Sequence, residues 1–183
     1  LTTSSAASDV YKRQIEGAII QMINHGITSG ALFMLVGFLY ERRHTRNISS
    51  FGGIKITMPK YAAIFLFTSF ASIGLPGLNG FVGEFMILMG SYDHYKVLTS
   101  IAAFGVVLAA IYMLWAYQRI FTGPISNDKN ENLNDLNIRE TLSIAPLMLL
   151  MLFIGIYPSF IESFVIQEAG FLSETIALFR DVN

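Results

Sequence analysis

The sequence predicts an all-α membrane protein with about four transmembrane helices, the second of them broken. Hydrophobic residues make up 53% of the chain and charged residues 14%, with a mean hydropathy of +0.53, whereas soluble domains carry about 25% charged residues. Four apolar segments are long enough for a bilayer crossing, which takes about 20 helical residues. The second segment has Pro and Gly at its centre, and these residues break a helix.

Three of the segments match one straight crossing each. They run over about residues 15–40, 98–121 and 141–165. Pro146 is expected in the first turn of the last of them and Pro158 near its end, so both are interpreted as helix punctuation.

The second segment, residues 61–92, is too long for a straight crossing. Its centre reads GLPGLNGFVGEF. Pro76 removes a backbone donor, and Gly77 and Gly80 loosen the helix. We therefore expect two half-helices joined from Leu75 to Gly80. A break at membrane depth is tolerated where the freed backbone is buried in protein or faces a watery cavity.

The two ends of the chain differ from this central region, residues 15–165. Residues 1–14 read LTTSSAASDVYKRQ, are polar without a period, and resemble translated sequencing-adapter read-through. We expect a non-native leader there, with a natural polar loop as the alternative. Residues 166–183 are amphipathic and are expected to lie in the membrane interface.

Lys and Arg are unevenly distributed among the loops. Residues 41–60 carry five and residues 118–140 carry three, whereas the short loop SYDHYK at residues 91–96 and the tail carry one each. Since cytoplasmic loops are rich in Lys and Arg, the first and third loops are predicted to face the cytoplasm and both chain ends the other side.

Glu84 is the only acidic or basic residue between Tyr61 and Met89. A charge at membrane depth costs about 2.5–3.5 kcal/mol or more and usually marks a proton or ion path. Glu84 is thus the leading candidate for proton binding. The alternative is a structural carboxylate capping the second half-helix. Asn79 is interpreted as a turn residue that tolerates left-handed geometry.

His25 lies near the middle of the first segment, and an imidazole can pass protons. The polar residues at helical spacing around it predict one polar stripe: Gln21, Asn24, Thr28 and Ser29. Gly26 and Gly30 predict a face for close helix contact. The alternative is a histidine that only packs against a neighbouring helix.

Several kinds of site are not predicted. Cysteine is absent, which excludes a thiolate-held iron–sulfur cluster in this chain. No Gly-rich phosphate loop, His/carboxylate metal spacing, Ser/His/Asp set or basic patch with interleaved aromatics is present, so no nucleotide, flavin, metal or nucleic-acid site is expected. Glu41 and Arg42 are interpreted as a positive-inside anchor, with contact to another subunit as the alternative.

Two stretches carry a family resemblance: MINHGITSGALFMLVGFLYERRHTR and GLPGLNGFVGEFMIL. They resemble the C-terminal third of subunit M of proton-translocating NADH:quinone oxidoreductase (respiratory complex I), the NADH dehydrogenase subunit 4 family. The resemblance covers residues 15–165. Sister subunits and cation/proton antiporter subunits usually place Lys where this chain has Glu84. The resemblance implies that His25 relays a proton to Glu84, which releases it outward.

The resemblance also implies the setting of this chain. It would supply the exit part of an antiporter-like proton path in a bacterial inner membrane, beside L- and N-like subunits. It would hold no redox cofactor, since NAD, FMN, iron–sulfur clusters and quinone are bound by other subunits. The alternatives are an antiporter-like subunit of a membrane-bound hydrogenase or cation/proton antiporter complex, and a structural membrane subunit whose polar residues only pack helices.

Overall fold

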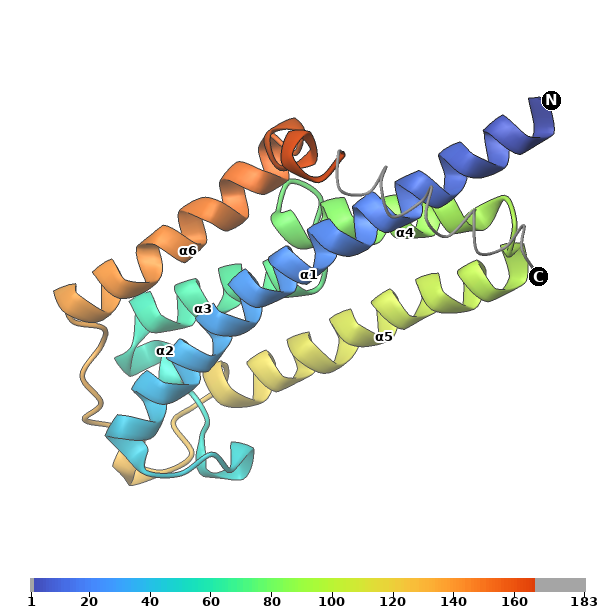
Figure 1. The fold of residues 1–183 in the computed structure, drawn as a ribbon. Coiled ribbons are helices and arrows are strands. Elements are labelled where there is room, and N and C mark those ends of the chain that lie inside the picture. Colours follow the sequence, from blue (N-terminus) through green and yellow to red (C-terminus); the bar gives the residue numbers. More distant parts are fainter. Residues whose placement is uncertain (1, 167–183) are drawn as a thin grey trace.

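The computed structural model describes residues 2–166, with side chains from residue 12 onward, and it is helical throughout (Figure 1). The α-helices are α1 (Thr2–Arg43), α2 (Ile54–Thr57), α3 (Pro59–Ser72), α4 (Asn79–Tyr92), α5 (Lys96–Phe121) and α6 (Ile138–Ile156). Short 3₁₀ turns lie at Ile48–Ser50 and Asp128–Asn130, and residues 159–166 are also helical. The predicted all-α class is confirmed.

Within the described residues, three helices are long and apolar enough to cross a membrane: Lys12–Arg43, Lys96–Phe121 and Ile138–Ile156. The predicted broken span is also confirmed. Helices α3 and α4 have 14 residues each, or about 21 Å at 1.5 Å per residue. They follow one another along α1, which packs most extensively against α4, while α5 and α6 flank them (Figure 1).

The break between α3 and α4 combines a helix cap with a tight turn. Gly74 has φ +72°, and the Leu75 N–H donates to the Phe70 carbonyl at 3.0 Å, which is the Schellman arrangement that ends a helix. Pro76 and Gly77, with Gly77 at φ +93°, then occupy the central positions of a type II turn. The break therefore begins before the expected Leu75, and Gly80 lies inside α4.

An aromatic cluster fixes α3 against α5. The ring centroid of Phe121 lies 4.7 Å from that of Tyr117, 5.0 Å from Phe65 and 5.7 Å from Tyr61. The Tyr61 hydroxyl donates to the Leu35 carbonyl of α1 at 2.8 Å, which satisfies a buried polar atom. Three helices are thus joined at one end of the molecule.

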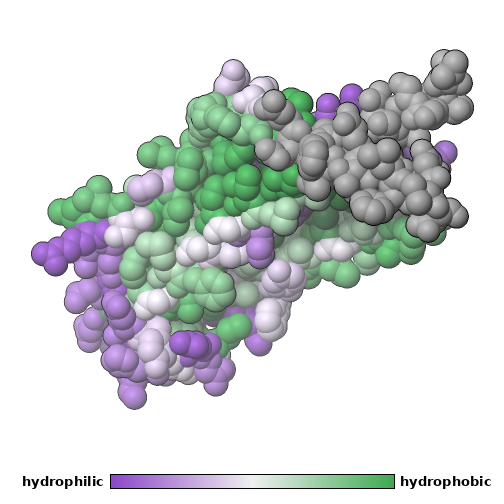
Figure 2. Space-filling view, in the orientation of Figure 1, coloured by the Kyte–Doolittle hydropathy of each residue, from purple (hydrophilic) through white to green (hydrophobic). Residues whose placement is uncertain are grey.

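Most of α5 is exposed although its side chains are apolar. A helix that is apolar all round suits hydrocarbon or contact with further helices rather than water. Figure 2 shows the apolar surface along the helices, with hydrophilic residues gathered at one end.

That hydrophilic end holds both loops predicted to be cytoplasmic. The Gly53 N–H donates to the Thr122 carbonyl at 3.2 Å, and the Ser126 hydroxyl donates to the Phe51 carbonyl at 3.2 Å. The two loops therefore lie on the same side, as their shared Lys and Arg excess predicts. Which side of the membrane they face stays a prediction.

The start of α6 differs from the prediction. Asn137 and Glu140 form a capping box, in which each side chain accepts from the other residue's backbone N–H. This cap begins the helix ahead of the apolar stretch, because it satisfies backbone donors that hydropathy does not register. Pro146 consequently lies in the helix interior, and its placement in the first turn was wrong.

The end of the fourth span also differs, because α6 stops at Ile156. Tyr157, which precedes Pro158, has φ −127° and ψ 67°, consistent with the bias of a residue before proline away from helix. The apolar stretch to residue 165 is therefore not one straight helix. The predicted interfacial tail, apart from its first residue, lies outside the described residues.

Helix α1 begins at Thr2 and continues without interruption into the apolar stretch. Helical backbone does not distinguish native from non-native residues, so the leader at residues 1–14 stays a prediction.

Candidate functional site

Glu84 lies in the second turn of α4 and is half-buried beside the break. The Gln21 Nε2 of α1 donates to Glu84 Oε1 at 3.2 Å. The other carboxylate oxygen lies over Gly74, where an added Cβ would come within 2.5 Å of Glu84 Oε2. Long helical side chains lean towards the helix N-terminus, which brings this carboxylate back to the turn that ends α3.

The capping alternative for Glu84 does not fit this geometry. The first turn of α4 contains no acidic residue, and its N-cap is Leu78. Capping oxygens act within the first turn, so Glu84 sits one turn too late.

Two asparagines join α1 to the start of α4. Asn24 Nδ2 donates to the Asn79 carbonyl at 2.7 Å, and Asn79 Nδ2 approaches the Asn24 carbonyl at 3.4 Å. Both side chains are fully buried. The expectation of left-handed geometry at Asn79 was wrong, because Gly74 and Gly77 provide the positive φ angles. Asn79 instead fixes the position of the broken helix against α1.

Small residues on α4 allow the close approach of neighbouring segments. A Cβ on Gly83 would lie 2.5 Å from Gln21 Oε1, so the Gln21 amide rests directly on the α4 backbone. A Cβ on Gly80 would run into the Ala71 carbonyl oxygen at the end of α3. These two glycines hold the second half-helix close to both α1 and α3.

The expected close contact at Gly26 and Gly30 is wrong for the described residues, since a Cβ at either position would meet nothing within 4 Å. Helix α1 turns its Gly17 towards Met86 of α4 instead. The small-residue face that the sequence predicts is therefore not the one that packs against α4. Gly17 lies nine residues before Gly26, and at about 100° per residue this places it on the opposite face of the helix.

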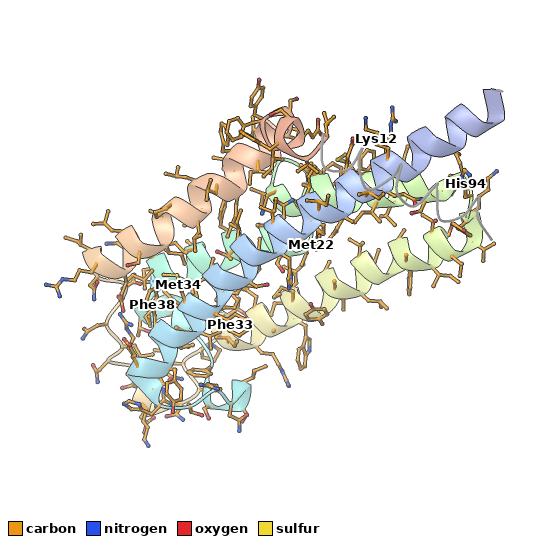
Figure 3. The ribbon with its side chains drawn as sticks, viewed as in Figure 1. Lys12, Met22, Phe33, Met34, Phe38 and His94 are labelled. Atoms are coloured by element: carbon orange, nitrogen blue, oxygen red, sulfur yellow. The ribbon has the colours of Figure 1, made fainter. Side chains whose placement is uncertain are left out.

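His25 lies away from Glu84, on an exposed face of α1. Its ring nitrogens are 3.3 Å from Ser29 Oγ, and this face also presents Met22 and Phe33, 66% and 77% exposed (Figure 3). Among the described residues, the hydrogen-bond partner of Glu84 is Gln21 rather than His25.

The expected single polar stripe is therefore divided. Asn24 and Thr28 are buried and Gln21 contacts α4, whereas His25 is exposed. A step of four residues turns the helix by about 40°, so Gln21 lies one turn before His25 on α1, and of the two it is Gln21 that contacts Glu84. Sequence analysis treated Gln21 only as a neighbour of His25, and its pairing with Glu84 had no signal beyond its polarity at helical spacing.

A groove between α4 and α5 opens onto Glu84. Its lining residues, apart from Glu84, are apolar: Ile87, Leu88, Ala102, Gly105, Val106 and Ala109. Glu84 thus contacts a polar amide of α1 and also lines an apolar groove towards α5. Within residues 2–166, no group of three or more His, Cys, Asp or Glu side chains gathers as a metal site.

Arg42, at the end of α1, binds within the chain. Its two terminal nitrogens each donate to a Glu140 carboxylate oxygen at 2.7 Å, and its Nε donates to the Asn134 carbonyl at 2.8 Å. Next to it, the Asp135 carboxylate accepts from the backbone N–H of Tyr61 at 3.0 Å. Arg42 therefore clamps the loop before α6, which sequence analysis did not foresee, although Asn137 and Glu140 have the spacing of a capping box.

Residues 6–112 match the family described as NADH:quinone oxidoreductase/Mrp antiporter, TM. The chain belongs to this family. It is 46% identical over 145 residues to NADH-quinone oxidoreductase subunit M of Rickettsia bellii, 42% over 151 residues to that of Rhodobacter capsulatus, and 40% over 142 residues to that of Mycobacterium tuberculosis. These alignments cover 79%, 82% and 78% of this chain.

Solved structures agree with the fold. A chain of respiratory complex I from Thermus thermophilus with bound NADH is similar over 92% of this chain and 36% of that chain, with a TM-score of 0.79 and 29% identity. A chain of the Mrp complex from Dietzia sp. DQ12-45-1b covers 87% of this chain and 37% of its own length, with a TM-score of 0.70 and 16% identity, which shows the shared fold alone. The chain spans 29%, 30% and 26% of the curated relatives named above.

Proposed function

We propose that this chain is the C-terminal part of an antiporter-like, proton-translocating membrane subunit of respiratory complex I, and that Glu84 binds and releases the proton in its exit part. The observation that carries the proposal is the Glu84 carboxylate, half-buried in the second half of a broken span and held by Gln21 against Gly74. An ionisable group in such a position marks a proton path by default, and broken helices form the ion sites of many transporters.

His25 is proposed to deliver protons towards Glu84 from the exposed face of α1. A His25–Ser29 pair inside a membrane span is costly in hydrocarbon, so we expect the preceding part of the subunit to cover it. The relatives support this, because the matched residues make up only 29% and 30% of their length, so that they contain further chain. Gln21, one turn before His25, contacts Glu84 and supports a short route between them.

The redox reaction is proposed to take place in other subunits, which would bind NAD, FMN, iron–sulfur clusters and quinone. The partners proposed for this chain are the rest of its own subunit, L- and N-like neighbours and lipid, in a bacterial inner membrane. Identities of 40% to 46% to subunit M favour complex I over a cation/proton antiporter, for which the 16% identity of the Mrp chain supports only a common fold.

The test is Glu84→Gln in the complete subunit. Glutamine keeps the size of the side chain but cannot bind and release a proton. Proton translocation per NADH in membrane vesicles should therefore fall at least about tenfold, because the loss of one proton-transferring group reduces a rate by at least this factor. Glu84→Asp should retain part of the activity.

The matched control is Glu41→Gln, the same change at an exposed carboxylate near the end of α1, which should leave translocation unchanged. Assembly of each complex is checked on a native gel. An assembled Glu84→Gln complex that translocates at the parental ratio would show that Glu84 is not part of the path.

A further inference from the structure

The Gln21–Glu84 pair joins α1 to α4 beside the break. Gln21 Nε2 donates to Glu84 Oε1 at 3.2 Å, and the two residues are 63 positions apart in the chain. A carboxylate without its proton is an acceptor only, so the amide nitrogen must face it in this state. The contact holds the Glu84 side chain on the α1 side of α4, with its other oxygen over Gly74.

The acceptor end of the same amide is buried without a partner among the described residues. Gln21 Oε1 is fully inaccessible and accepts no hydrogen bond there, while it rests against Gly83, where an added Cβ would lie 2.5 Å away. A buried amide oxygen without a donor costs free energy. An apolar side chain of the same size would fill this space without that cost. The presence of an amide here therefore indicates that its oxygen has a function.

The chemistry of the pair gives that use. A protonated carboxyl group has one O–H donor, and an amide offers both a donor and an acceptor at nearly the same place. Half a turn about the terminal bond of Gln21 would exchange Nε2 for Oε1 in front of Glu84. The amide can then donate to the carboxylate and accept from the acid, so that it partners both states of a group that gains and loses a proton.

We propose that Gln21 positions Glu84 in both protonation states, its amide turning as the proton binds and leaves. This inference rests on the proposed role of Glu84. Gln21 itself carries no proton. It acts by keeping the Glu84 carboxyl group beside the break, between Gln21 of α1 and Gly74. Gly83 leaves the space in which the amide lies.

The experiment replaces Gln21 by Met in the complete subunit of the assembled complex. Methionine is unbranched, of similar length and compatible with a helix, but it has no N–H donor. Proton translocation per NADH should fall about tenfold, as expected for the loss of one hydrogen bond to a charged group. In infrared difference spectra, the carbonyl band of protonated Glu84, identified by its absence in Glu84→Gln, should move to higher wavenumber because the acid loses its partner.

Gln118→Met is the matched control, since Gln118 is exposed at the far end of α5, and it should change neither the band nor translocation. If the Gln21→Met complex does not assemble, Gln21→Asn takes its place. Its amide is one methylene too short to reach Glu84, and the same band shift is expected.

The outcomes separate the two proposals. If Glu84→Gln blocks translocation while the Gln21 variants leave the band and the rate unchanged, the inference fails and the proposed function stands. If the Gln21 variants lower only the thermal stability and the band does not move, Gln21 is a packing residue and the inference fails as well. If Glu84→Gln translocates normally, the proposed function fails, whatever the band shows.

Discussion

At the scale of single residues, the position of Glu84 depends on a residue that has no side chain. Gly74 ends α3 in left-handed geometry, and the absence of a Cβ leaves room for Glu84 Oε2. Two requirements therefore coincide at one glycine. The neighbouring Gly77 shares the positive φ but would meet nothing within 4 Å if it carried a Cβ.

Gly74→Ala should therefore lower both stability and proton translocation. Left-handed geometry costs a non-glycine residue about 1–2 kcal/mol, and the new methyl group would displace the Glu84 carboxylate. Gly77→Ala should introduce the same backbone strain without a clash with Glu84, so we expect lower stability but near-normal translocation in the assembled complex. The measurements are the thermal unfolding midpoint in detergent and proton translocation per NADH. Equal translocation by the two variants would show that the Gly74–Glu84 contact has no functional role.

At the scale of elements, the break is an ordered connection rather than a weakened helix. A Schellman cap, a type II turn and the reciprocal Asn24–Asn79 contacts define it. Sequence reasoning would expect alanine at Pro76, Gly77 and Gly80 to stabilise the segment by restoring helix propensity. The structure reverses this expectation, because the positive φ of Gly77 and the contact of Gly80 with Ala71 both oppose alanine.

Gly80→Ala should destabilise the subunit by about 1–3 kcal/mol, the usual range for overpacking, because its Cβ would press on the Ala71 carbonyl. The matched control is Gly105→Ala in α5, which would meet nothing within 4 Å and should be neutral or stabilising by up to about 1 kcal/mol through helix propensity. Thermal unfolding midpoints of the two variants in detergent provide the comparison. A Gly80→Ala subunit as stable as the Gly105→Ala subunit would mean that α3 and α4 are not packed this closely.

At the scale of the whole molecule, polar contacts at one end hold together helices that are far apart in the sequence. Arg42 joins α1 to the loop before α6, and Asp135 of that loop caps α3. In the same region, Arg43 donates to the buried Asn130 at 2.7 Å. Arg42, which was interpreted as part of a membrane anchor, thus holds the end of α1 to the loop before α6 and to Glu140.

Arg42→Ala should destabilise the subunit by about 2 kcal/mol, because the Arg42 and Glu140 side chains are 15% and 11% exposed, so the pair lies between an exposed ion pair and a fully buried one that loses a partner. Arg46→Ala should cost no more than about 1 kcal/mol, because Arg46 is exposed and stacks on Tyr40. Arg42→Lys should restore only part of the loss, as lysine cannot make both hydrogen bonds. Similar unfolding midpoints for the Arg42→Ala and Arg46→Ala variants would contradict the clamp.

The two loops at this end, residues 41–60 and 118–140, carry most of the loop Lys and Arg residues, and they are therefore predicted to face the cytoplasm. Single cysteines can be introduced at the exposed positions Ser49 and Asp93, since the chain has no cysteine of its own. A membrane-impermeant thiol reagent added to intact cells should label Asp93→Cys and leave Ser49→Cys unlabelled. The reverse pattern would overturn the predicted topology, and permeabilised cells, in which both should react, provide the control.

The sequence by itself determined the membrane class, the broken second span and the shared end of the two basic loops, and it made Glu84 the leading candidate for proton binding. These features follow from composition, from the backbone limits of Pro and Gly, and from the cost of one charge in an apolar stretch, all of which are local. Only the tertiary structure decided which face of α1 meets α4, that Gln21 rather than His25 contacts Glu84, that Gly74 makes room for its carboxylate, and that Arg42 turns inward to Glu140. Those outcomes depend on helix rotation, on the course of the chain through the break, and on contacts between residues 63 and 98 positions apart, and neither hydropathy nor helical periodicity specifies them.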